Sequence, residues 1–547
     1  MKLKNILYSM MMGTAVLTGT TSCVSDLDQY PHTETTSKDV YTSLANYEAV
    51  LGKIYAAMVT SGQGKGGDNK DMESVLNAGS GFDYMRMFIN MQECGTDEFA
   101  STWLTGEQTT GLTYLSWDAN DAWVSDMYYR IYYNIALCNE FLRNANNANF
   151  SGADAEKMKE YKAEVRFMRA LFYYHALDFY RNIPMVTEND PVGSYIPPRY
   201  TPQQTFDYIE SELKDCVGDM LPASTCPYGQ ASQGAAYTLL AKLYLNSEVY
   251  TGVAKYAECM EACKKVMDMG YSLESDYSKL FNADNDKRTN EIIFALPVSA
   301  EHTVSWGSST YLVCGQLSMS NANQNVADYG VTAGWSEFRL RPEFVDKFTQ
   351  TDIDGNGDKR CKFFTNGQSK DVTSMTDETA GYLSEKWSNL KDDGTTASNT
   401  GDAGVDTDFP LFRLADVYLM YAECVVRLHN DWDNWAGGSD AADPDQGAIY
   451  WINQLRERSH ASDVWASNFA DDDAFLQFIL DERARELYHE GYRRTDLIRY
   501  GQFTTNKYIW QWKGGVHDGQ AVDSKYNIYP IPNTELTANP NLHNDNY

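Results

Sequence analysis

The stretch ERARELYHEGYRRTDLIRYGQF, from Glu482 to Phe503, carries a charge pattern that could belong to the acid/base centre of an enzyme or to a structural network of ion pairs. Glu482, Glu486 and Glu490 recur at every fourth position, and on a helix this spacing places three carboxylates on one face. Five arginines are interleaved with them: Arg483, Arg485, Arg493, Arg494 and Arg499. Because cations surround these carboxylates, the pattern favours ion pairs between neighbouring helices over the acid/base centre of an enzyme.

The rest of the chain also lacks the usual sequence signs of an enzyme. It contains no HExxH motif, no GxSxG nucleophile elbow and no paired histidine ligands. With 76 acidic residues, a pair of carboxylates close enough for catalysis can always be imagined, so such pairs carry little information. We therefore expect no enzymatic activity. Measurable turnover of a purified substrate would be the observation against this expectation.

Composition limits the partners. The chain has 547 residues, enough for two or more domain-sized units, and a net charge of -31, which argues against nucleic acid and anionic phosphate surfaces as ligands. Aromatic residues make up 13% of it, including 38 Tyr and 12 Trp. The ten cysteines form no CxxC pair and no zinc pattern, so we expect most of them to be small buried residues, with one or two disulfides as the alternative.

The first residues have the pattern of a secretory signal peptide. Lys2 and Lys4 precede an apolar stretch that runs through Leu17, and small residues follow up to Cys23. The apolar stretch is too short to span a bilayer. We expect residues 1–22 to be the signal peptide.

The residues around Cys23 are similar to a bacterial lipoprotein signal, in which this cysteine becomes the first mature residue and carries the lipid. Thr20 departs from that pattern, because leucine is more usual at that position. Residues 23–40 are polar and suit a tether, and Asp26 and Asp28 resemble the acidic signal that directs such lipoproteins to the outer cell surface. The alternative is a secreted protein with a free cysteine.

The chain after about residue 40 has the periodicity of helices joined by long loops. Helical spacing of apolar residues covers 121–143 and 154–181, and Thr201 with Pro202 predicts an N-cap and first turn of a helix that runs to about Val217. A further amphipathic helix is predicted over 413–428.

One helix pair has the spacing of a tetratricopeptide unit. Leu240, Ala241 and Tyr244 fit its first helix, and Tyr256, Cys259 and Cys263 fit its second, after an insertion. We therefore expect a mainly α-helical repeat scaffold over 41–275 that resumes over 411–547. Between them, residues 276–410 are rich in Gly, Ser, Asn, Thr and Asp, with short β-like runs such as EIIFALPV, and we expect a loop-rich second lobe that carries the ligand site.

The loop TDIDGNGDKR resembles a calcium loop. Oxygen donors alternate along it, at Asp352, Asp354, Asn356 and Asp358. The twelfth position, where calcium loops place a bidentate glutamate, is Phe363. Calcium binding and an ordinary acidic loop therefore both stay open.

Aromatic residues in loops are the stronger indication of function. Sugars stack their C–H faces on Trp and Tyr rings while polar side chains bond their hydroxyls. Five such residues lie in Gly-, Ser-, Asn- and Thr-rich stretches: Trp103, Trp306, Tyr311, Tyr329 and Trp335. Trp123 and Tyr128, in contrast, lie on a predicted helix and are expected in the core. For any single loop ring the alternative is local packing beneath the loop.

The segment at 482–503 also carries a family resemblance. It is similar to the C-terminal signature of the SusD/RagB family of outer-membrane lipoproteins, matched here by Glu490, Gly491, Arg493, Asp496, Leu497 and Arg499. Further segments resemble that family in the same order along the chain: EVRFMRALFYYHALDFYRNIPMV, GQASQGAAYTLLAKLYL, RLADVYLMYAEC, INQLRERSH and YPIPNTELTANPNL.

The resemblance implies a tetratricopeptide-based helical fold and no catalysis. It implies a surface-exposed, lipid-anchored protein of the outer membrane that binds glycans and delivers them to a SusC-type TonB-dependent channel. A RagB-like peptide-binding protein on the same scaffold is the alternative. The resemblance does not fix the binding residues, although the family tends to place aromatic residues near positions like Trp103 and Trp335.

Overall fold

The computed structural model describes residues 37–62, 64, 71–77, 82–401, 404–428 and 447–547. The predicted signal peptide, Cys23 and most of the predicted tether lie outside these residues. The chain divides into two compact units, Met1–Tyr47 and Glu48–Tyr547, and the second contains the candidate site and both cavities described below. Within the described ranges, no helix has both the length and the apolar character needed to cross a bilayer.

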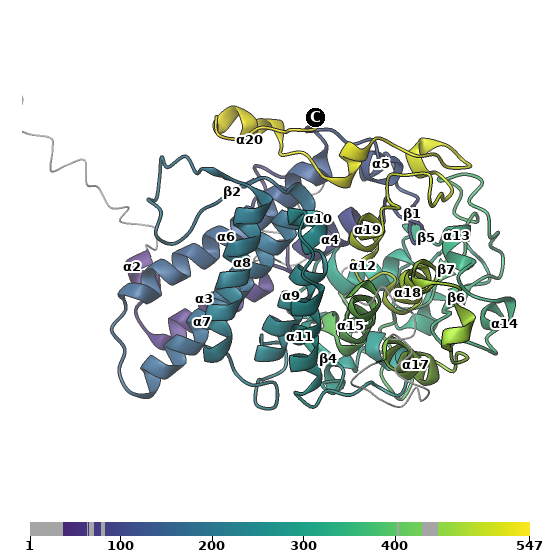
Figure 1. Cartoon of the computed structure of the whole chain (residues 1–547), viewed down its shortest axis with the longest axis horizontal. Helices are drawn as coiled ribbons and strands as arrows, with labels where there is room; N and C mark the ends of the chain where they lie inside the picture. The colour runs from purple at the N-terminus through teal and green to yellow at the C-terminus, as the bar shows by residue number, and fades with distance from the viewer. Residues whose placement is uncertain (1–36, 63, 65–70, 78–81, 402–403, 429–446) are drawn as a thin grey trace, which may run out of the picture. The chain divides into compact units, whose positions relative to one another are not determined.

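Helices form most of the regular structure, as predicted (Figure 1). The described helices are α2 (Ser37–Val40), α3 (Leu44–Ala56), α4 (Tyr84–Glu93), α5 (Thr110–Tyr114), α6 (Ala122–Asn147), α7 (Ala153–Tyr180), α8 (Pro202–Cys216), α9 (Gln233–Leu245), α10 (Ser247–Thr251), α11 (Tyr256–Met267), α12 (Ser308–Gly315), α13 (Pro342–Val345), α14 (Gln350–Ile353), α15 (Leu414–Leu428), α17 (Ala448–Arg458), α18 (Asp472–Leu487), α19 (Arg493–Arg499) and α20 (Asn533–Ala538).

The long helices pack in chain order. Helix α6 lies against α7, α7 against α8, α9 against α11, and α11 against α15, and Figure 1 shows α8, α9 and α11 running side by side. Helix α8 begins at the predicted residue, where Thr201 and Gln204 form a capping box and Pro202 occupies the first turn. Trp123 and Tyr128 of α6 are buried, as expected.

The predicted tetratricopeptide pair is α9 and α11. The thiol of Cys259 donates a hydrogen bond to the carbonyl of Ala241 over 3.2 Å, so the two helices approach closely where small residues face each other. The short helix α10 accounts for the insertion between them. All nine described cysteines are free thiols, and seven are buried, which agrees with their interpretation as small core residues.

Strands are few and short in the described residues, and they form four antiparallel pairs. The strands are β1 (Ala100–Ser101), β2 (Ile183–Pro184), β3 (Arg199–Tyr200), β4 (Ile292–Leu296), β5 (Phe338–Arg339), β6 (Phe363–Phe364), β7 (Leu383–Ser384) and β8 (Phe409–Arg413). The pairs are β1–β5, β2–β3, β4–β8 and β6–β7. The β-like run at 291–298 is β4, and its pairing with β8 joins the start of the loop-rich segment to the C-terminal region. The boundaries of a separate lobe at 276–410 stay a prediction.

The charged ladder at 482–490 is part of the helical frame. Glu482 forms ion pairs with Arg360, Arg456 and Arg485 at 2.7–2.9 Å. Glu486 lies 3.1 Å from Arg413, 3.3 Å from Arg360 and 2.5 Å from Arg458. Burial alone would raise the pKa of Glu486, but these arginines outweigh it and lower the pKa to about 2. A carboxyl held ionised in this way cannot serve as a general acid at neutral pH.

The expectation of three carboxylates on one helix is wrong for Glu490, which lies beyond the end of the helix. Helix α18 ends at Leu487, and the chain turns through His489 (φ 57°) and Gly491 (φ 84°). A Cβ atom at Gly491 would lie 2.4 Å from the ring of Phe88, so the turn requires glycine at this position. Glu490 still joins the network, because it pairs with Lys386 at 2.6 Å and Arg413 at 2.8 Å.

Candidate functional site

The pairing of β1 with β5 brings two of the predicted aromatic residues together. Ser101 lies opposite Phe338, and the hydrogen bond from the Thr102 amide to the Glu337 carbonyl (2.7 Å) continues this pairing. Just beyond it, the indole N–H of Trp103 donates to the carbonyl of Trp335 over 3.1 Å. Residues more than two hundred positions apart in the chain therefore meet at one place.

Arg86, on α4, lies at the centre of this group. Its guanidinium lies 4.2 Å from the ring centroid of Tyr311 and 5.8 Å from that of Trp335. It also donates to the carbonyl of Trp306 over 2.7 Å. Four of the five predicted aromatic residues thus meet around Arg86: Tyr311 and Trp335 through their rings, Trp306 through its backbone carbonyl, and Trp103 through the Trp335 carbonyl.

The loop that carries Trp306 is fixed from below by Asp83. Asp83 caps α4 by accepting from the Arg86 amide, and it also accepts from the Ser305 hydroxyl (2.7 Å) and the Ser308 amide (3.1 Å). A Cβ atom at Gly307 would lie about 2.2 Å from the Asp83 carboxylate, so glycine allows this close approach. The loop that carries the exposed Trp306 is therefore held in place by fixed contacts.

The rings differ in what they offer to solvent. Trp103 is 45% exposed and Trp306 is 40% exposed, although each is a large apolar side chain. Trp335 is half-buried beside them. Large exposed indole rings on segments that are held in place by fixed contacts are candidates for ligand contact.

Tyr311 corrects the expectation of an exposed loop ring. It lies on α12, is 1% exposed, and donates its hydroxyl to Asn90 over 2.6 Å. It supports Arg86 from inside and cannot stack on a ligand. Tyr329 is half-buried and lies elsewhere: its hydroxyl donates to Glu385 and its carbonyl accepts from the Asn389 amide.

The charges beneath the rings nearly cancel. Arg86 is paired with Glu107 and with Glu337, the latter at 3.1 Å. Burial raises the pKa of Glu337 well above its usual value, and the nearby Glu107 adds to this effect while Arg86 opposes it. The two carboxyl groups therefore balance the charge of Arg86, which offers no free positive charge to an anionic ligand. Such a site suits a neutral ligand.

Comparison with known proteins gives the family. A curated relative, the starch-binding protein SusD of Bacteroides thetaiotaomicron, is 32% identical over 99% of both chains. The chain belongs to the SusD family. A SusD-like protein of Bacteroides ovatus is 23% identical over 79% of this chain and 76% of its own. The family model described as "SusD family" matches residues 362–547, and the one described as "Starch-binding associating with outer membrane" matches residues 27–245.

Solved structures of similar proteins share the fold. A SusD-like carbohydrate-binding protein from Bacteroides fragilis superposes with a TM-score of 0.71 at 18% identity, covering 92% of this chain and 100% of its own. Surface glycan-binding protein A from Bacteroides thetaiotaomicron, solved with laminarihexaose, has a TM-score of 0.67 at 16% identity, covering 92% and 99%. The mainly helical SusD-like fold predicted from sequence is therefore confirmed.

The predicted calcium donors of this SusD-family chain have other partners. Asp352 accepts from the Asp358 amide (2.6 Å) and caps α14 with Thr349, while Asp358 binds the Arg360 guanidinium at 2.6 Å. Asp354 accepts from the side chain of Gln350. Asn356 donates its side-chain amide to the Asp354 carbonyl.

Across the described parts of the chain, no group of three or more His, Cys, Asp and Glu side chains could hold a metal ion. Calcium does not enter the proposed function.

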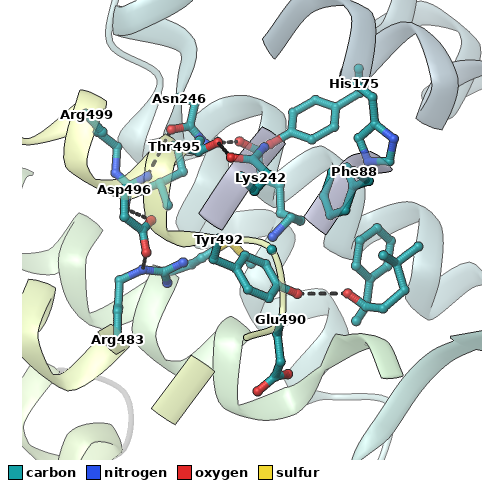
Figure 2. A pocket seen from close by; sticks show the side chains of 17 residues that line it. Phe88, His175, Lys242, Asn246, Arg483, Glu490, Tyr492, Thr495, Asp496 and Arg499 are labelled. Carbon is teal, nitrogen blue, oxygen red and sulfur yellow. Dashed lines mark hydrogen bonds and ion pairs between the residues drawn. The ribbon is translucent and has the colours of Figure 1, made fainter. Parts of the chain in front are cut away.

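An internal cavity near α4, α9 and α19 belongs to the frame. It measures about 30 Å³, which is room for a water molecule but not for a sugar. Figure 2 shows Arg483 and Arg499 directed at Asp496 on its wall, and both pairs measure 2.8 Å. Lys242, also labelled there, pairs with Asp416 at 2.9 Å. These contacts neutralise the charges that the family signature places in the interior.

Sequence reasoning missed Arg86, Glu107 and Glu337. A signal for Arg86 was present, because it stands between Met85 and Met87 on a short apolar helix. A buried charge in such a position requires partners, and its partners mark a polar centre. The two glutamates could not be assigned to it, since they lie 21 and more than two hundred residues further along the chain and gave no spacing to follow.

Proposed function

We propose that this chain is a glycan-binding protein of the cell surface that captures oligo- or polysaccharide, and that it is not an enzyme. One observation carries the proposal: Arg86 lies against the Trp335 ring and holds the backbone of Trp306, Trp103 bonds the Trp335 carbonyl, and Trp103 and Trp306 are 45% and 40% exposed. The name of the relative at 32% identity, a starch-binding protein, supports the same class of ligand.

Binding would use the rings as a platform. Indole faces attract the slightly positive C–H edges of a pyranose ring and exclude water from it, while the sugar hydroxyls stay hydrated or bond to polar groups at the rim. The platform needs little reorganisation because β1–β5 pairing and the Asp83 contacts already hold it in place. The near-neutral charge beneath the rings favours uncharged sugars over uronic acids or sulfated sugars.

The proposal also includes a place in the cell. Cys23 would carry the lipid, residues 23–40 would act as a tether, and the protein would deliver its ligand to a SusC-type TonB-dependent channel of the outer membrane. The family model described as associating with the outer membrane supports this location. Isolation of outer membranes with and without a Cys23→Ala substitution tests the anchor, and co-purification of the channel tests the partner.

Calorimetry against a panel of glycans tests the ligand. The panel contains glucose oligosaccharides of six or seven units in α-1,4, β-1,3 and β-1,4 linkage, together with peptides of similar length. We expect one of the glycans to bind, and Trp335→Ala to weaken that binding at least tenfold with an unchanged melting temperature. Trp465→Ala is the matched control, because Trp465 is 55% exposed and lies outside the cluster. Binding of peptides alone would favour the peptide-binding alternative, and release of shorter sugars would show an enzyme.

A further inference from the structure

A second cavity opens next to the aromatic cluster. It measures about 370 Å³, more than ten times the internal cavity. Helix α3 supplies one wall through Glu48, Leu51, Gly52, Tyr55 and Ala56, and Val59 lies just beyond the end of this helix. The turn at 228–230, the end of β4 and Thr303 supply the others. Glu48, Gly52 and Pro297 of its lining are exposed, so the cavity is open to solvent.

The helix surface at Gly52 is open, and no packing contact explains why glycine stands there. A Cβ atom there would meet nothing within 4 Å, and the φ of this residue lies in the ordinary helical range. Glycine in a helix interior is unfavourable relative to alanine, and the fold gains no close contact in return. Close approach of a ligand to the helix backbone would give this glycine a role.

The lining has a distinct chemistry. None of its twelve residues is Lys, Arg or His, so an anionic group would find no counter-charge there. Two tyrosines, Tyr55 and Tyr228, contribute aromatic rings. The side-chain carbonyl of Gln230 is buried and accepts no hydrogen bond from the described residues. The Tyr228 hydroxyl lies beside Asp408, whose pKa burial raises to about 7. The Tyr55 hydroxyl already bonds Glu164 and the Ala231 amide, so the unused acceptor is that of Gln230. Aromatic rings, one unused acceptor and no cation in the lining fit a neutral polyhydroxylated molecule.

The cavity is also continuous with the aromatic cluster. Thr303 lines the cavity, and three residues later Trp306 lies in the cluster. Between them, the Ser305 hydroxyl contacts both Asp83, beneath the cluster (2.7 Å), and the carbonyl of Val59, on the cavity wall (3.4 Å). One short segment therefore separates the two surfaces and is fixed to both.

We propose that this cavity is a second saccharide subsite, which takes a neutral sugar unit at or beside the end of a glycan held on the aromatic cluster. The proposal rests on the proposed function, since it assigns part of the same ligand. The sugar unit would belong either to that glycan or to a separate short oligosaccharide, and the two cases share the same chemistry.

Substitutions at Gly52 test the subsite with little risk to the fold. Gly52→Phe places a ring in the open space, whereas the control Gly52→Ala adds one methyl group and should only raise the melting temperature. The probes are the hexa- or heptasaccharide that binds best in the panel and the trisaccharide of the same linkage, measured by calorimetry. We expect Gly52→Phe either to weaken binding of the longer probe at least fivefold or to remove a second equivalent of the trisaccharide, while Gly52→Ala matches the wild type.

Wild-type affinity and stoichiometry of Gly52→Phe for both probes would overturn the subsite. If that outcome accompanies loss of binding in Trp335→Ala, the proposed function stands and only the subsite fails. If the wild type binds no glycan, both fail. Should Gly52→Phe lose its cooperative melting transition, Gln230→Leu decides: it removes the unused acceptor, and a loss of affinity below threefold for the longer probe would overturn the proposal.

Discussion

Replacing Glu486 by glutamine tests whether the charged ladder is structural. Glu486 is buried and pairs with Arg360, Arg413 and Arg458. Its pKa is lowered from 4.5 to about 2, which corresponds to about 3 kcal/mol of stability at neutral pH. Removing one partner from a buried ion pair costs about 3–5 kcal/mol, and all three arginines keep other carboxylates, which places the loss at the lower end of that range. We therefore expect Glu486→Gln to lower the free energy of unfolding by about 3 kcal/mol.

Urea denaturation followed by tryptophan fluorescence measures this loss. Because the folded-state pKa lies below the unfolded value, the contribution of Glu486 is present above about pH 4.5 and disappears as the pH falls towards 2. The difference between variant and wild type should therefore shrink in acid. Glu457→Gln is the control, because Glu457 is exposed on α17 and should change stability by less than about 0.5 kcal/mol. A loss below about 1 kcal/mol, or abolished glycan binding at unchanged stability, would refute the structural role.

Three further predictions concern other parts of the molecule. Arg86→Met should weaken glycan binding at least tenfold in calorimetry, because it removes the cation that holds the carbonyl of Trp306; unchanged affinity would separate Arg86 from the site. Burial raises the pKa of Glu93 to about 7, so its contribution to stability is present below about pH 4.5 and is lost as the pH rises through 7. Glu93→Gln should therefore gain stability relative to the wild type between pH 5 and pH 8 in urea denaturation, and an equal difference at both values would contradict this. Iodoacetamide labelling with peptide mass spectrometry should modify Cys226 and Cys361 before the seven buried thiols, and early labelling of a buried thiol would show an opening that the structure lacks.

Local signals in the sequence were sufficient for the helical frame. Thr201 and Pro202 mark the start of α8 because capping depends on residues three positions apart. The α9–α11 pair follows from small and large residues at helical spacing, which the Cys259–Ala241 contact confirms. The family signature then fixed the order of the remaining helices.

The parts of the candidate site that could not be predicted from the sequence depend on contacts between residues far apart in the chain. The pairing of β1 with β5 joins Ala100 to Arg339, and two-residue strands leave no pattern that periodicity can detect. Tyr311 was expected in a loop because Gly and Ser precede it, yet the apolar residues that follow place it in a buried helix. The composition of a loop therefore suggested where rings lie, but only the packing of distant segments separates an exposed ring from a supporting one.

A crystal structure of the protein with the best-binding glucose oligosaccharide would test the central claim most directly. The account predicts sugar rings stacked on Trp103, Trp306 and Trp335, with Arg86 beneath them and without direct contact to the charged ladder. A ligand bound at another surface, with these three indole rings free of sugar, would contradict it.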